Sequence, residues 1–263
     1  MEYIRTVIDN GVATVTFDRP PVNALNAQAF REIGDTFAEL NRSEEAVVVI
    51  FTATGDRAFC GGVDLNDSAR RHSSQVVGGD SIVDRLDPGS IVRDCFWAMH
   101  DCSLPVIGAV NGAAVGAGLC LVATCDIIIA SERARFALTE INAGVLGGGR
   151  HLQRMVGPYK MRKMFYTGEF VSAEEFYRLG VVEEVVPHDR LLASARVLAD
   201  KIASKSPVGL RLAKESLNRV EDLPLKEGYR LEQDYTRRLT RFQDSAEARL
   251  AYLEKRPPAW TWR

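Results

Sequence analysis

The sequence predicts one large α/β domain with a parallel sheet, followed by a helical segment at the carboxyl end. Three runs rich in β-branched residues, at 46–52, 106–110 and 126–130, are typical of strands covered on both faces. A Gly/Ala-rich helix at about 116–123 lies between the last two runs. Strand–helix–strand units of this kind imply parallel strands joined by right-handed crossovers. The 263 residues suffice to bury a full core.

The first predicted elements are a hairpin, a helix and a buried strand. Residues 3–8 and 12–17 are short β-branched-rich runs joined by the turn signal DNG. A helix is predicted over 27–40, where apolar residues recur at helical spacing. The buried run at 46–52 then leads directly into a glycine-bearing segment at 55–65.

A long polar segment comes next. Residues 66–90 are rich in Ser, Gly, Asp and Arg with little periodicity, which predicts a mobile loop with room for one short helix. Residues 91–100 are predicted to form a helix. The stretch at 104–130 is almost uncharged, but its Asn111-Gly112 is a strong turn signal. A buried strand, turn and helix are therefore predicted there in preference to a membrane span.

The last third is predicted to be mainly helical. Ser172 opens a capping box of sequence SAEE, residues 181–186 form one short strand, and Asp189 caps the helix that follows. Three further helices are predicted. The first starts at the cap and first-turn proline Ser206-Pro207, and the others start at about Leu225 and Asp244. No linker separates independent domains. Residues 1–204 are predicted to form the core and residues 205–263 a helical region of the same structural domain.

Composition narrows the classes of function. The formal net charge is −2, whereas a nucleic-acid binder normally carries a strong basic bias. The amino terminus lacks both an apolar signal core and an arginine-rich transit pattern, so a cytoplasmic location is expected. The five cysteines form no CxxC pair and no metal-ligand spacing, which indicates packed, reduced thiols. They are Cys60, Cys95, Cys102, Cys120 and Cys125.

Two glycine-bearing turns stand at the ends of buried strands, FCGGVDL at 59–65 and NGAAVGAG at 111–118. Small residues let the backbone approach a ligand closely, and the first N–H groups of a following helix lack internal partners. Two such donors converging on one oxygen form an oxyanion hole. For either turn alone, tight helix packing is the alternative explanation. No GxGxxG follows a strand, and neither GxxxxGK[ST] nor GxSxG occurs.

These turns belong to an ordered series of motifs: RPPVNALN, AFCGGVDL, PVIGAVNGAAVGAG, CDIIIASERARFALTEINAGVLGGG and AYLEKRPPAW. The series resembles the crotonase, or enoyl-CoA hydratase/isomerase, family over essentially the whole chain. The resemblance implies a crotonase-type spiral of ββα units with a C-terminal helical region used for trimerisation. It also implies an enzyme that acts on acyl-CoA thioesters as a homotrimer or homohexamer. Coenzyme A arrives as part of the substrate, and neither a metal nor a further cofactor is implied.

The resemblance also assigns roles to individual residues. It places the two oxyanion donors at the backbone N–H groups of Val63 and Ala117, and a catalytic carboxylate at Glu140. The residues that it implies in substrate or CoA binding are Ala24, Gly62, Val63, Asp64, Leu65, Asn66, Ala117, Cys120, Tyr252 and Lys255. Tyr252 and Lys255 fall where the family's last helix reaches the adenosine end of CoA, often across a subunit contact.

One departure from the family pattern bears on the reaction. Family hydratases hold a water between two glutamates, and Cys120 occupies the position of the first. Glu140 is then the only acid/base, with its pKa raised in an apolar pocket, which favours an enoyl-CoA isomerase or hydratase type of activity. The alternatives are another crotonase reaction, such as C–C cleavage, hydrolysis or decarboxylation, and a non-catalytic acyl-CoA-binding or RNA-binding relative. Arg150 and His151 are interpreted as first-turn residues of the next helix.

Overall fold

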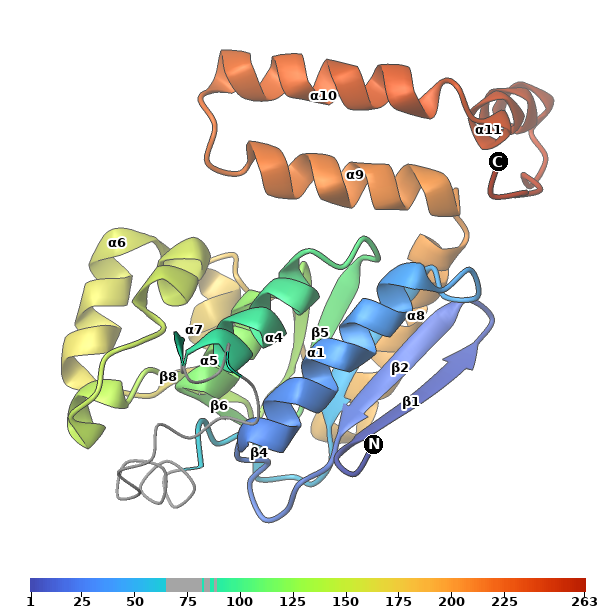
Figure 1. The fold of residues 1–263 in the computed structure, drawn as a ribbon. Coiled ribbons are helices and arrows are strands. Elements are labelled where there is room, and N and C mark those ends of the chain that lie inside the picture. The colour runs from blue at the N-terminus through green and yellow to red at the C-terminus, as the bar shows by residue number, and fades with distance from the viewer. Residues whose placement is uncertain (65–81, 83–85, 88) are drawn as a thin grey trace.

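The computed structural model describes residues 1–64, 82, 86–87 and 89–263. The predicted loop at 66–90 lies largely outside the described residues, as do the proposed binding residues Leu65 and Asn66. The centre of the molecule is a six-stranded sheet of order β1-β2-β3-β5-β7-β10 (Figure 1). Its strands are β1 (Ile4–Asp9), β2 (Val12–Phe17), β3 (Val48–Ala53), β5 (Val106–Val110), β7 (Ile127–Ser131) and β10 (Glu184–Val186). All neighbours are parallel except β1 and β2, which form the predicted hairpin.

Side chains of the buried strands alternate between two apolar cores. In β3, Val49 and Phe51 face the larger core, whereas Val48 and Ile50 face a smaller one closed by helix α8 (Leu191–Ala203). This alternation is the period-two pattern of a strand, and it requires apolar residues at every position because both faces are covered. The continuous run at 46–52 therefore correctly predicted a doubly covered strand.

Helices α1 (Ala27–Arg42) and α4 (Ser90–His100) pack side by side on the face opposite α8 (Figure 1). The Asn26 side chain caps α1 by accepting from the Ala29 N–H at 2.8 Å. The described part of the core also contains α5 (Ala117–Ala123), α6 (Gly149–Thr167), α7 (Ala173–Arg178) and two short 3-10 turns, η1 (Glu140–Ala143) and η2 (His188–Arg190).

A second, smaller sheet lies beside the first and was not predicted. Its order is β4-β6-β8-β9, and its strands are β4 (Ala58–Cys60), β6 (Ala113–Val115), β8 (Arg135–Ala137) and β9 (Val171–Ser172). Strands of two or three residues are too short to produce a detectable alternation in the sequence. This sheet matters for function because β4 and β6 are parallel neighbours that end together at the two glycine-bearing turns.

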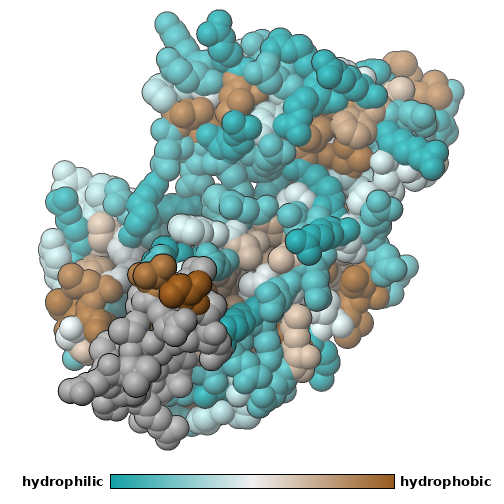
Figure 2. Space-filling model, in the orientation of Figure 1, coloured by the Kyte–Doolittle hydropathy of each residue, from teal (hydrophilic) through white to brown (hydrophobic). Residues whose placement is uncertain are grey.

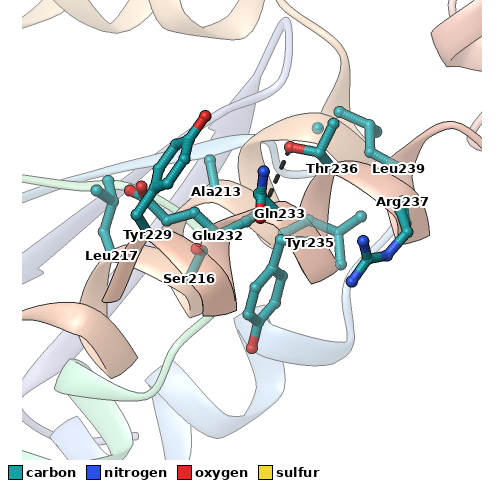
Figure 3. A pocket seen from close by; sticks show the side chains of 12 residues that line it. Ala213, Ser216, Leu217, Tyr229, Glu232, Gln233, Tyr235, Thr236, Arg237 and Leu239 are labelled. Carbon is teal, nitrogen blue, oxygen red and sulfur yellow. Dashed lines mark hydrogen bonds between the residues drawn. The ribbon is translucent and has the colours of Figure 1, made fainter. Parts of the chain in front are cut away.

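The carboxyl-terminal region is entirely helical in its regular structure. Helices α9 (Pro207–Val220) and α10 (Leu225–Leu239) form a hairpin above the core, and α11 (Gln243–Glu254) follows at one end (Figure 1). A crevice of about 640 Å³ lies between α9 and α10, with Tyr229, Gln233 and Thr236 from α10 facing Ala213 and Ser216 from α9 (Figure 3).

Helix starts in the last third of the chain mostly match their predicted residues. Ser206 caps α9 by accepting from the Gly209 N–H at 3.1 Å, and Ser172 caps α7 by accepting from the Glu175 N–H at 3.2 Å. The prediction that Asp189 caps a helix is wrong. Asp189 lies inside η2, and Arg190 occupies the cap position of α8 without a side-chain hydrogen bond. Because η2 begins directly after Pro187, the helical geometry starts before Asp189, whereas the capping pattern placed its start after Asp189.

One buried ion pair attaches α9 to the core. The Lys214 ammonium lies 2.7 Å from Asp126 Oδ2 and 3.2 Å from the Leu104 carbonyl, and its side chain is only 4% exposed. Asp126 also accepts from the Val106 N–H at 2.7 Å, at the start of β5. The pair thus links the terminal helices to the edge from which two central strands begin.

We expect Lys214→Met to lower the free energy of unfolding by about 2–3 kcal/mol, somewhat less than for a fully buried pair because Asp126 is partly exposed. Urea unfolding measures the change. The matched control is Lys160→Met, which removes the more exposed pair with Glu175 and should have a much smaller effect. Equal effects of the two substitutions would contradict a special anchoring role for Lys214.

Among the described residues, no helix has the length and apolar composition that crossing a membrane requires. The apolar stretch at 104–130 instead forms β5, β6, α5 and most of β7. Every residue of α5 is buried.

Candidate active site

Two segments far apart in sequence are joined at the first glycine-bearing turn. The Leu25 N–H donates to the Gly62 carbonyl at 2.7 Å, and the Asp64 N–H donates to the Leu25 carbonyl at 2.9 Å. The Arg19 guanidinium completes the junction by donating to Asp64 Oδ2 at 2.8 Å and to the Ala24 carbonyl at 2.9 Å. Arg19 therefore fixes Ala24 and Asp64 relative to each other, and both are predicted CoA-binding residues.

The two predicted oxyanion donors lie on adjoining turns. Gly62 has φ +92°, and a β-carbon built on it would lie 2.9 Å from the Val115 carbonyl oxygen and 3.9 Å from the Ala117 nitrogen. A side chain at position 62 would thus push the turns apart, which explains the glycine. Within the described part of the chain, neither the Val63 nor the Ala117 N–H donates to an acceptor. Ala117 is the first residue of α5, where unpaired N–H groups are expected.

Glu140 stands directly beside the second turn. It follows β8 as the first residue of η1, and a β-carbon built on Gly116 would lie 2.6 Å from its Oε1 atom. Its Oε2 atom is buried and has no hydrogen-bond partner among the described residues. Burial raises the pKa of Glu140, although the backbone N–H groups of Glu140 and Thr139 partly oppose this. The carboxyl group of Glu140 therefore holds its proton more tightly than an exposed glutamate does.

Cys120 belongs to α5, next to the same site. Its side chain is 3% exposed, and its Sγ atom lies 3.0 Å from where a β-carbon on Gly148 would be. Burial, and then the charge of Glu140, raise the pKa of the Cys120 thiol. The thiol is therefore a packed neutral group beside Glu140 and carries no negative charge there.

The remaining predicted residues separate into two groups. Val63, 43% exposed, and Asp64 line a groove of about 800 Å³ together with Ala24 and Arg19. Tyr252 and Lys255 lie at the far end of the molecule, at α11, and Tyr252 is 85% exposed. One chain does not bring them to Glu140, so their contact with CoA across a subunit interface stays a prediction.

Apolar side chains are exposed in the segment that follows Glu140. Ile141, Val145 and Leu146 are exposed, and all three lie within the short segment between Glu140 and α6. Figure 2 shows apolar residues gathered on the same face as the grey segment. Exposed apolar side chains that follow a partly buried carboxyl group in the chain suit an acyl chain better than a charged ligand.

The arrangement of two sheets and terminal helices is that of the crotonase fold. An enoyl-CoA hydratase from Bacillus anthracis matches it with a TM-score of 0.89 and 30% identity, over 99% of this chain and 100% of that one. The family model "Enoyl-CoA hydratase/isomerase" matches residues 7–263, so the chain belongs to the enoyl-CoA hydratase/isomerase family. It is an enzyme of the crotonase type that processes acyl-CoA thioesters. The predicted fold class and family are confirmed.

Curated relatives carry several activities. The chain is 38% identical to the (7aS)-7a-methyl-1,5-dioxo-2,3,5,6,7,7a-hexahydro-1H-indene-carboxyl-CoA hydrolase of Rhodococcus jostii, over 96% of this chain and 95% of that one. It is 33% identical to the carnitinyl-CoA dehydratase of Proteus mirabilis, over 96% and 95% respectively. The relatives therefore agree on acyl-CoA chemistry and differ in the reaction.

Sequence reasoning did not single out Arg19 or Gly116. Arg19 contacts Asp64, which is 45 positions away in the sequence. The motif RPPVNALN marked the segment that contains Arg19 but did not indicate this contact. Gly116 was noted as a small residue of the turn, but its proximity to the Glu140 side chain depends on how β6 and β8 pair. Arg150 and His151 do lie in the first turn of α6, as predicted.

Proposed function

We propose that the protein stabilises an acyl-CoA enolate between the Val63 and Ala117 amides and uses Glu140 as its only acid/base. The observation that supports this most directly is the Glu140 carboxyl group, which lies beside the start of α5 and has a buried oxygen with no partner in the described part of the chain. A thioester oxygen held by two amides makes the neighbouring C–H more acidic, because negative charge develops where the donors point. We propose no metal or redox cofactor.

With one carboxylate, double-bond isomerisation needs no further group. Glu140 takes a proton from C2 of a 3-enoyl thioester, and the electron pair spreads over the enolate and the double bond. The same carboxylic acid returns the proton at C4, which gives the 2-enoyl thioester. Hydration requires in addition an oriented water and a second proton-transfer group, and the buried Cys120 thiol supplies neither.

Hydrolytic C–C cleavage is the second candidate, because the relative at 38% identity is named as a hydrolase of a dioxo-substituted ring thioester. In this reaction Glu140 takes a proton from water, and the hydroxide oxygen attacks the C3 carbonyl of a 3-oxoacyl thioester. The C2–C3 bond breaks, and its electron pair forms the thioester enolate in the oxyanion hole. Glu140 then returns the proton to C2. One acid/base again suffices.

A side-by-side product assay separates these reactions. The purified protein is incubated with crotonyl-CoA, 3-hexenoyl-CoA and 2-oxocyclohexane-carboxyl-CoA in deuterium oxide, and the thioesters are analysed by mass spectrometry. Formation of 2-hexenoyl-CoA identifies an isomerase, and ring opening identifies a hydrolase. Rapid hydration of crotonyl-CoA would contradict a single acid/base. Absence of both product and deuterium exchange at C2 would contradict enolate formation.

The pH dependence should reflect the raised pKa of Glu140. The group must be deprotonated to accept the proton, so kcat/KM is expected to fall as pH decreases through the raised pKa, above the ordinary value of 4.5. This fall in kcat/KM is the acid limb of the pH profile. A pH series of kcat/KM between about 4 and 9 measures it, with protein stability followed in parallel. An acid limb centred at or below 4.5 would contradict a buried catalytic carboxyl.

Restoring a carboxylate at the first position should not restore hydration. Cys120 is packed against Gly148, so Cys120→Glu introduces a larger, charged side chain into an occupied space beside Glu140. We expect the variant to lose about 2 kcal/mol of stability and to gain no hydratase activity. Cys120→Ser is the small-residue control. A large gain in crotonyl-CoA hydration would instead show that only the missing carboxylate limits that reaction.

We further propose that the protein assembles as a homotrimer or a hexamer of two trimers through residues 205–263. Large apolar side chains on these helices are exposed in the single chain, including Leu225 at 86%, Tyr252 at 85% and Leu253 at 77%. Surfaces of this kind commonly mark subunit contacts. Light scattering of the purified protein gives the mass, and a monomer at micromolar concentration would contradict the assembly.

A further inference from the structure

We propose that Gly116 is a positioning residue that lets the Glu140 carboxylate lie beside the first amide of α5. This inference rests on the proposed role of Glu140 and concerns how the acid is held in place. A β-carbon on Gly116 would lie 2.6 Å from Oε1, 3.3 Å from Cδ and 3.6 Å from Oε2 of Glu140. Carbon–oxygen contacts as short as the first do not occur in folded proteins, so the carboxylate occupies the space that any other residue would fill.

The backbone of Gly116 is fixed on both sides. Its N–H donates to the Ala137 carbonyl at 2.9 Å, and its carbonyl accepts from the Cys120 N–H at 3.1 Å. The first bond links the turn to the end of β8, three residues before Glu140, and the second begins the hydrogen bonding of α5. A side chain at position 116 therefore cannot be accommodated by moving the turn without breaking one of these bonds.

The Glu140 side chain is the part that can move. The nearest atoms to the added carbon are all carboxylate atoms at the end of a flexible side chain. Glu140 is partly exposed, so rotation of its side chain toward solvent relieves the clash. Such a rotation takes the carboxylate away from the Ala117 amide, and hence from the carbon next to a thioester bound there.

Gly118, two positions later, shows the contrast. A β-carbon on Gly118 would lie 2.3 Å from the Cys60 carbonyl oxygen, which is backbone of β4 and cannot rotate away. The lack of a side chain at Gly118 is therefore needed for α5 to pack against the small sheet. The missing side chain of Gly116 instead makes room for a group that carries out chemistry.

The test is Gly116→Ala. We expect kcat to fall by at least about 100-fold, because the acid/base is displaced, while KM and the affinity for a non-reactive acyl-CoA analogue change by less than about three-fold. We also expect the acid limb of the pH profile to move to lower pH, because a carboxylate turned toward solvent loses the burial that raised its pKa. A purely structural role for Gly116 would not move this limb.

The positive-φ control is Gly180→Ala. Gly180 has φ +74°, and a β-carbon there meets no atom within 4 Å. Gly116 has φ +56° and ψ −121°, a backbone conformation that residues with a side chain rarely adopt, so Gly116→Ala adds backbone strain as well as the contact with the acid. Gly180→Ala should lower stability and leave kcat unchanged, and Glu140→Asp in the G116A background separates the strain from the contact with the acid.

A second variant tests the contact itself. Aspartate is one methylene shorter than glutamate, so Glu140→Asp withdraws the carboxylate from position 116. We expect Glu140→Asp to lower kcat in the parent protein and to raise it in the G116A background. Parent-like kcat in G116A, or a kcat loss in G116A that E140D fails to relieve, overturns the positioning role. Glu140→Gln is assayed alongside: parent-like turnover in that variant contradicts the proposed function itself, whatever Gly116 does.

Discussion

Glu140→Gln is expected to lower kcat by about 10²–10⁴-fold, the range that general acid–base groups contribute. The substitution keeps the size of the side chain and removes its ability to carry a proton between substrate atoms. Binding of the CoA part should change little, because Glu140 lies beside the second turn and the groove at Ala24 and Asp64 is lined by other residues. Steady-state kinetics and titration with an acyl-CoA analogue measure the two quantities. Parent-like turnover would exclude Glu140 as the acid/base.

The same substitution should stabilise the fold. The folded pKa of Glu140 lies above its unfolded value, so the folded state binds the proton more tightly than the unfolded state. Stability therefore decreases as pH rises from 4.5 through the folded pKa, and the charged form remains unfavourable above it. Glu140→Gln removes this penalty, so Tm should rise relative to the parent at pH 8 and the difference should vanish near pH 4. A lower Tm at pH 8 would mean that the carboxylate has a stabilising partner.

The sequence was most informative where residues repeat with a period. The runs that form β3, β5 and β7, and the helices with capping serines at 172 and 206, follow local rules of alternation, spacing and capping. The glycine-bearing turns were found as well, because small residues at strand ends form a visible pattern. These local features, with the family resemblance, predicted the fold class.

Features that depend on long-range packing escaped prediction. The small sheet has strands of two or three residues, whose pairing depends on tertiary contacts and leaves no periodic signal. Arg19 acquires its role only when the segment at 61–64 lies against it. Glu140 was placed by family resemblance, whereas its contact with Gly116 follows from the parallel pairing of β6 with β8. Asp189 shows a different error. Aspartate is a typical capping residue, but here it lies one residue before the actual cap position of α8, which is Arg190.

The second large effect is expected from Ala117→Pro. Ala117 is the first residue of α5, a position where proline is tolerated because the N–H has no helical partner. The substitution therefore deletes the proposed oxyanion donor while keeping the helix. Removing one such donor costs on the order of 3 kcal/mol in the barrier, so kcat should fall by about 10²–10³-fold. Ala117→Gly keeps the N–H and should retain most of the activity.

Proline also adds ring atoms where the N–H pointed, so a second replacement isolates the hydrogen bond. An ester in place of the amide at residue 117, introduced by semisynthesis, removes the donor without adding bulk. If the ester variant binds an acyl-CoA analogue like the parent but loses kcat to the same extent as Ala117→Pro, the amide acts in the transition state. Full activity of the ester variant would show that Ala117 donates nothing to the reacting oxygen, and catalysis would then depend on Val63 and Glu140 alone.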